Sequence, residues 1–174
     1  IDAELDALLP PPDDSAADGA DELVAEPTKI SPPPLRPLAR DAVRALRARD
    51  FAALERAVRR AAAEGRGLGA IARVRAVAEL ARGDLEAARR HLRESRASGK
   101  EDPGATARHH VAEALLEMCG GNPTRGVRAA LAALAISRRL ADARGEAAAL
   151  RVLSACYRAL GRDDQARRLE LGAP

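Results

Sequence analysis

The sequence predicts an all-α protein: helical hairpins that stack in a row, preceded by an acidic, proline-rich arm. Three observations lead to this prediction. Aromatic residues make up only 1% of the 174 residues, which argues against β-folds because strands are rich in aromatic side chains. Ala is the commonest residue, and it both favours helices and lets helix axes approach closely. Turn residues recur along the chain at a nearly constant spacing.

The first element is the arm, residues 1–37. It holds nine acidic and two basic residues, for a net charge of −7, whereas residues 38–174 hold 17 acidic and 27 basic residues, for a net charge of +10. Eight of the eleven prolines also lie in the arm. Such a segment cannot bury enough apolar surface to offset its loss of conformational entropy. We therefore expect disorder over residues 1–37, ending in a stiff polyproline-like stretch.

One stretch of the arm has helical periodicity. Its apolar residues lie at positions i, i+4, i+7 and i+8: Ile1, Leu5, Leu8 and Leu9. A short acidic helix over residues 1–9 has two interpretations. It is either a docking motif that folds on a partner or the last turn of a helix that begins upstream. Because the first residue is Ile rather than Met, we expect that further sequence precedes it.

Residues 38–174 form the repeat domain. Four turn signals, at Arg49, Gly83, Gly121 and Gly161, separate stretches of helical periodicity and are 34, 38 and 40 residues apart. The pattern predicts eight helices in four hairpins. They are expected at about 38–48, 51–63, 70–82, 85–97, 105–119, 123–140, 144–160 and 163–171.

The turn residues also predict how the helices end and begin. A Gly after a helix adopts the left-handed conformation, and an Asp or Asn beside it offers an oxygen to the N–H groups of the next helix. The expected caps are Asp50, Asp84, Asn122 and Asp163. Pro123 suits the first position of a helix. Longer breaks are expected between the hairpins, at 65–69, 98–104 and 141–145.

The fourth hairpin carries a family resemblance. Residues 145–166 resemble the tetratricopeptide repeat, most of all the variety with a period near 40 that occurs in kinesin light chains and many bacterial signalling proteins. Leu153-Ser154 stand at the family's Leu-Gly pair, and Tyr157 stands at its aromatic position. Gly161 matches the turn, and Ala166 matches the small residue of the second helix.

The resemblance extends more weakly over residues 38–173. The second and third units have Glu79 and Glu117 at the aromatic position, and the first unit lacks the turn Gly. The resemblance implies an α-solenoid in which small residues mark the contacts between helices. These residues are Ala42, Ala76, Ala88, Ala114 and Ala166.

The resemblance further implies that the first helix of each hairpin lines a concave groove. The groove positions carried over from the turns are Arg73, Val77, Arg108, Val111, Met118, Arg151 and Arg158. The doubled glycine at 120–121 leaves the third unit's alignment open by one residue. Arg binds carboxylates through two parallel hydrogen bonds, so an acidic peptide is the expected ligand. The alternative is that an Arg- and Ala-rich composition merely places these side chains in solvent.

Catalytic and cofactor chemistry is not expected. His109 and His110 point about 100° apart on a helix and have no further ligands in metal-binding spacing. No phosphate-binding loop or hydrolase motif occurs. Cys119 and Cys156 are expected to be free thiols packed as small apolar groups. The sequence contains no membrane-length apolar run, and we expect a cytoplasmic protein without metal or cofactor.

The sequence therefore predicts a non-enzymatic adaptor or scaffold that binds a protein segment. One alternative is a sensor or dimerisation module of a larger bacterial signalling protein. Another is a nucleic-acid-binding helical repeat, since the repeat domain is basic, although no basic run or DNA-binding motif supports it. The arm is either a solvated tail or an internal ligand of the groove.

Overall fold

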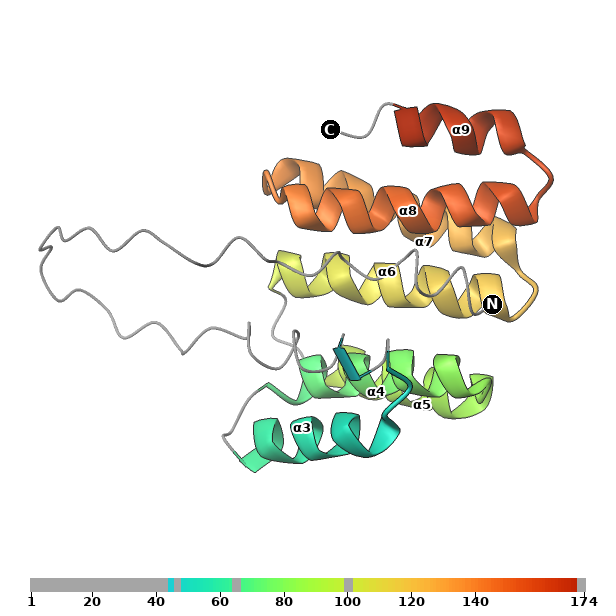
Figure 1. Cartoon of the computed structure of the whole chain (residues 1–174). Helices are drawn as coiled ribbons and strands as arrows, with labels where there is room; N and C mark the ends of the chain where they lie inside the picture. The colour runs from blue at the N-terminus through green and yellow to red at the C-terminus, as the bar shows by residue number, and fades with distance from the viewer. Residues whose placement is uncertain (1–43, 46–47, 64–66, 99–101, 172–174) are drawn as a thin grey trace, which may run out of the picture.

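The computed structural model describes residues 44–45, 48–63, 67–98 and 102–171, and these residues contain helices and no strand, which confirms the all-α prediction (Figure 1). The arm, its stretch 1–9 and Ala42 lie outside the described residues. No described helix is long and apolar enough to cross a bilayer. The described helices are α3 (Phe51–Ala63), α4 (Leu68–Arg82), α5 (Leu85–Ala97), α6 (Pro103–Cys119), α7 (Pro123–Arg139), α8 (Ala143–Ala159) and α9 (Asp163–Leu171).

The helices pair and stack in chain order. Short turns join α4 to α5, α6 to α7 and α8 to α9, and the partners in each pair contact each other. The first helices of successive pairs also contact one another: α6 lies against both α4 and α8. The helices α4, α6 and α8 therefore form a continuous row through the described part of the chain (Figure 1).

The four predicted turn positions share one backbone geometry. Arg49, Gly83, Gly121 and Gly161 all have positive φ angles, from 51° to 82°. After each of them, the next N–H donates to the carbonyl oxygen five residues earlier, as from Asp84 to Glu79 at 2.9 Å. Gly120 has a φ of −79°. Gly121 is therefore the turn residue of the third unit, and the alignment of α6 with α4 and α8 needs no shift.

The break expected at residues 141–145 is shorter than predicted. Helix α8 begins at Ala143, so the connection from α7 is as short as those within the pairs. Asp142 caps α8 by accepting the Gly145 N–H at 3.0 Å, which draws Gly145 into the first turn. Ala141 takes the left-handed conformation, with a φ of 51°, at a cost of about 1–2 kcal/mol for a residue with a side chain.

Two of the four predicted caps are confirmed. Asp50 accepts the Ala53 N–H at 2.7 Å, and Asp84 accepts the Ala87 N–H at 2.9 Å. The other two predictions are wrong, for different reasons. The side-chain amide of Asn122 donates back to the Gly120 carbonyl at 3.2 Å, because Asn, unlike Asp, carries a donor. Asp163 lies inside α9, since the Arg162 carbonyl already accepts the first helical hydrogen bonds.

The core is built from small side chains. Four of the predicted contact alanines are fully buried: Ala76, Ala88, Ala114 and Ala166. Gly126 stands five residues after its turn Gly, the same offset as Ala88 and Ala166. A Cβ at Gly126 would lie 2.7 Å from Cys156 Sγ and 3.0 Å from the Ala114 carbonyl oxygen. Helices α6, α7 and α8 therefore meet too closely there for any side chain.

Candidate functional site

The predicted groove residues all lie on the row of first helices. Helix α4 carries Arg73 and Val77, α6 carries Arg108, Val111 and Met118, and α8 carries Arg151 and Arg158. The predicted docking residues Ile1, Leu5, Leu8 and Leu9 lie outside the described residues.

The three apolar residues of the predicted groove lie at the surface of the core. Val77, Val111 and Met118 are each partly buried, and each packs against the main core cluster. They therefore contribute to the packing of the row, and each keeps a partly exposed surface.

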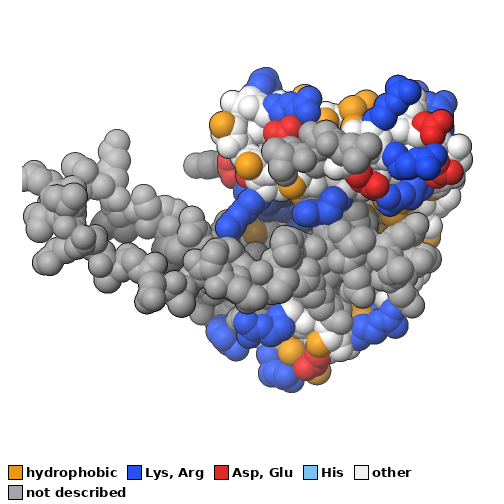
Figure 2. Space-filling model, turned by 45° about the horizontal axis from the view of Figure 1, so that its top comes forward, with side chains coloured by type: hydrophobic (Ala, Val, Ile, Leu, Met, Phe, Trp, Pro, Cys, Tyr) orange, Lys and Arg blue, Asp and Glu red, His pale blue; other side chains and the backbone are white. Residues whose placement is uncertain are grey.

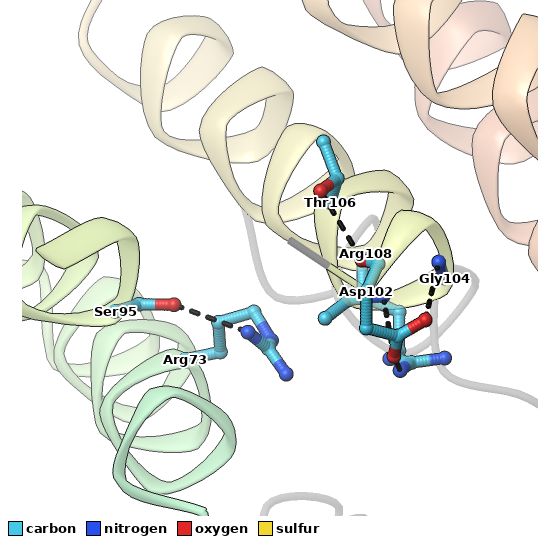
Figure 3. A network of polar contacts seen from close by, with 7 residues as sticks. Arg73, Ser95, Asp102, Gly104, Thr106 and Arg108 are labelled. Carbon is cyan, nitrogen blue, oxygen red and sulfur yellow. Dashed lines mark hydrogen bonds and ion pairs between the residues drawn. The ribbon is translucent and has the colours of Figure 1, made fainter. Parts of the chain in front are cut away.

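Arg73 is a half-buried cation on α4. Its Nη1 donates to Ser95 Oγ of α5 at 3.2 Å (Figure 3). Burial lowers the pKa of Arg73, nearby Arg108 lowers it further, and Asp102 partly opposes the shift. The described residues place no carboxylate within ion-pair distance of Arg73. The guanidinium is thus partly desolvated and keeps several unused N–H donors.

Arg108 approaches the same place from α6. It is exposed, and its Nη2 lies 3.3 Å from Asp102 Oδ2. That carboxylate is already engaged, because it caps α6 by accepting the N–H groups of Gly104 and Ala105 at 3.0 and 3.2 Å. Figure 3 shows Arg73 and the Arg108–Asp102 pair facing each other from neighbouring helices. The one carboxylate near both guanidinium groups is therefore already occupied by Arg108 and the α6 cap.

Arg151 and Arg158 differ in their surroundings. Burial lowers the pKa of Arg151, and its buried Nε finds no hydrogen-bond acceptor among the described residues. Arg158 instead forms an ion pair with Glu170 of α9. The same carboxylate accepts the Ser154 hydroxyl at 2.7 Å. Arg158 thus serves the contact of α8 with α9, whereas the partly buried Arg151 is the α8 arginine with an unsatisfied donor.

Sequence reasoning missed one group beside Arg73. The buried Nδ1 of His109 has no hydrogen-bond partner among the described residues. Burial lowers the pKa of His109, Glu113 opposes this, and the nearby side chains of His110, Arg73 and Arg96 lower it further. Those side chains come from α6, α4 and α5, so local sequence spacing could not reveal their meeting.

The arrangement favours anions over cations. Figure 2 shows that basic side chains outnumber acidic ones over the visible described surface. No group of three or more His, Cys, Asp or Glu side chains suited to a metal ion occurs in the described ranges. Arg73 and Arg108 together offer more N–H donors than Ser95 and Asp102 accept. The chemistry on offer is the binding of a carboxylate or a similar anion.

No family model, curated protein or solved structure matches the chain. The resemblance to tetratricopeptide repeats therefore stays a prediction.

Proposed function

We propose that this chain is a non-enzymatic protein–protein interaction module, an adaptor or scaffold that binds an acidic protein segment across α4, α6 and α8. The proposal includes a tetratricopeptide-like α-solenoid of four hairpins in a cytoplasmic protein. The repeated left-handed turns support it, and so do the contacts of α6 with both α4 and α8. The buried small residues at matching positions support it too.

The pair Arg73 and Arg108 carries the proposal. A half-buried guanidinium without a carboxylate of its own is energetically unfavourable, and its neighbour adds repulsion. A ligand carboxylate placed between the two would offset both effects. Hydrogen bonds to charged groups contribute about 1.5–3 kcal/mol each, so one such contact is worth roughly tenfold or more in affinity.

Arg151 supplies a second anchor farther along the row. Packed helices lie about 8–10 Å apart, so α8 is roughly 20 Å from α4. An extended peptide rises about 3.3 Å per residue, so about six residues span the two anchors. Helix α6, which carries the partly buried Val111, lies between α4 and α8. The favoured ligand is thus an extended segment with acidic residues near both ends and apolar ones between.

Fluorescence anisotropy with the full chain tests the proposal. The probe is a fluorescein-labelled peptide of alternating Glu and Gly, compared with its Gln–Gly counterpart. The double variant Arg73→Gln with Arg151→Gln is expected to weaken binding of the Glu probe at least tenfold. The matched control is Arg90→Gln with Arg93→Gln, two exposed arginines of α5, which changes net charge equally and should alter affinity less than twofold.

Equal losses in the two double variants would mean diffuse charge attraction and would refute the proposed site. Failure of the Glu probe to bind at all would refute the proposed function. The other interpretations of the sequence, a sensor or dimerisation module and a nucleic-acid-binding repeat, have no comparable observation among the described residues.

A further inference from the structure

The chain carries its own candidate ligand. Residues 1–37 hold nine acidic and two basic residues, and they are joined to a domain of charge +10. The face of α4, α6 and α8 has Arg73 without a carboxylate of its own and Arg151 with an unpartnered buried Nε, both judged among the described residues. A surface with two arginines that keep unsatisfied donors is thus linked covalently to a segment rich in carboxylates.

The point of attachment brings the two together. Ala45, a few residues after the arm, is buried in one cluster with Leu54 of α3 and Ala78 of α4. The first described residues after the arm thus pack against α3 and α4, and α4 carries Arg73. A chain of 37 residues spans up to about 120 Å when fully extended. That distance exceeds the roughly 20 Å from α4 to α8 estimated from helix spacing.

We propose that acidic residues of the arm occupy the Arg73–Arg108–Arg151 face of their own chain and compete there with an outside acidic partner. This inference rests on the proposed function, because it assigns a regulator to the same surface. The carboxylates of the arm contact the arginines, and the apolar residues of 1–9 cover the side chains of Val77 and Val111. An outside partner must displace the arm before it binds.

Tethering makes weak contacts effective. A covalent link between a ligand and its site gives an effective concentration on the order of millimolar. If the separate arm bound with a dissociation constant of about 0.1 mM, it would occupy most of the site and reduce the apparent affinity of a competitor about tenfold. Removing the acidic charges of the arm should therefore raise the apparent affinity of the competitor about tenfold.

The test replaces the nine acidic residues of the arm by Asn or Gln in the full chain and measures binding of the Glu–Gly probe. Affinity is expected to rise about tenfold. The matched control repeats the replacement in the Arg73→Gln, Arg151→Gln background, where it should change affinity less than twofold. Amide hydrogen exchange of residues 1–9 gives a second readout: protection in the parent chain should be lost in the arginine double variant.

The possible outcomes separate the two claims. Unchanged probe affinity after arm neutralisation, with binding still dependent on Arg73 and Arg151, overturns the inference and leaves the proposed function standing. An equal rise in both backgrounds also overturns it, because the arm would then act through its overall charge alone. If even the neutralised arm variant shows no binding that depends on these arginines, the proposed function itself fails.

Discussion

The contact of Gly126 with its neighbours gives the sharpest structural prediction. An added Cβ would lie 2.7 Å from Cys156 Sγ on α8 and 3.0 Å from the Ala114 carbonyl oxygen on α6. Both distances are well inside ordinary van der Waals contact. The neighbours cannot yield easily, since one is backbone and the other is a fully buried side chain. Burial and the nearby Cys119 raise the pKa of Cys156 to about 11, so the thiol packs as a neutral group.

The expected magnitude for Gly126→Ala follows from two opposing effects. Helix propensity favours Ala over Gly by about 1 kcal/mol, whereas overpacking a core costs about 1–3 kcal/mol. Two clashes on two different helices place the cost at the upper end, so the net loss should be about 1–2 kcal/mol. With an unfolding entropy of about 2.1 cal/mol/K per residue, the melting temperature of the described domain should fall by about 4–8 °C.

Differential scanning calorimetry checks this value against two further variants. At Gly104, a Cβ would first meet Arg108 Nη1 at 3.3 Å, the end of a flexible side chain, so Gly104→Ala should leave the melting temperature unchanged or raise it. Adding Cys156→Ala to Gly126→Ala removes the closest clash. The double variant should therefore lose less stability than the two single losses combined. If Gly126→Ala stabilises the protein as much as Gly104→Ala does, the close approach of α6, α7 and α8 is wrong.

Three further changes are predicted. Asp102→Ala removes a helix cap and should cost about 1 kcal/mol of stability, yet it should tighten binding of the Glu–Gly probe because Arg108 loses its internal carboxylate. Ala166→Phe should lower stability by about 1–3 kcal/mol through overpacking between α8 and α9. The parent chain should lose more stability than His109→Gln as the pH falls from about 7 to below 6.5, toward the folded-state pKa of His109, measured by urea unfolding.

The pH prediction follows from the sign of the pKa shift. Burial lowers the pKa of His109 below its ordinary value of 6.5, so the unfolded chain takes up the proton more readily than the folded chain. Stability therefore falls as the pH drops below about 6.5 and stops falling below the folded-state pKa. The matched control is His110→Gln, which removes the neighbouring imidazole. An equal pH dependence in the parent chain and His109→Gln contradicts this explanation.

The other two predictions have their own contradicting results. Weaker probe binding by Asp102→Ala would mean that the carboxylate assists the ligand rather than competing with it. An unchanged melting temperature for Ala166→Phe would remove Ala166 from the contact between α8 and α9 and would undermine the alignment of the repeats.

The helices were predictable because their determinants are local. Left-handed turns at Gly83, Gly121 and Gly161 are determined by glycine itself, and Pro123 begins α7 as expected. The helix expected at about 144–160 corresponds to α8, which begins at Ala143, but the break expected at 141–145 was too long because Gly145 resembles a helix breaker. It is instead required inside the helix, where a Cβ would lie 2.6 Å from Ser137 Oγ. Only the packing of α7 on α8 reveals this requirement.

The site was predictable in its positions but not in its pairings. The spacing of the turns placed Arg73, Arg108 and Arg151 on one row of helices. It could not show that Arg158 pairs with Glu170 or that Ser95 contacts Arg73 from 22 residues away. Such partners depend on how separate helices pack. The described structure therefore shows that Arg108 and Arg158 form ion pairs, whereas Arg73 and Arg151 keep unsatisfied donors, which sequence reasoning could not do.

The central claim is that the arginines of α4, α6 and α8 contact an acidic segment. Nuclear magnetic resonance of the arginine Nε–Hε groups in the full chain tests it most directly, with the Glu–Gly peptide as titrant. The account predicts that the signals of Arg73, Arg108 and Arg151 shift and saturate together, whereas those of Arg90 and Arg93 on α5 stay in place. Equal shifts at all five arginines, or shifts confined to α5, would contradict it.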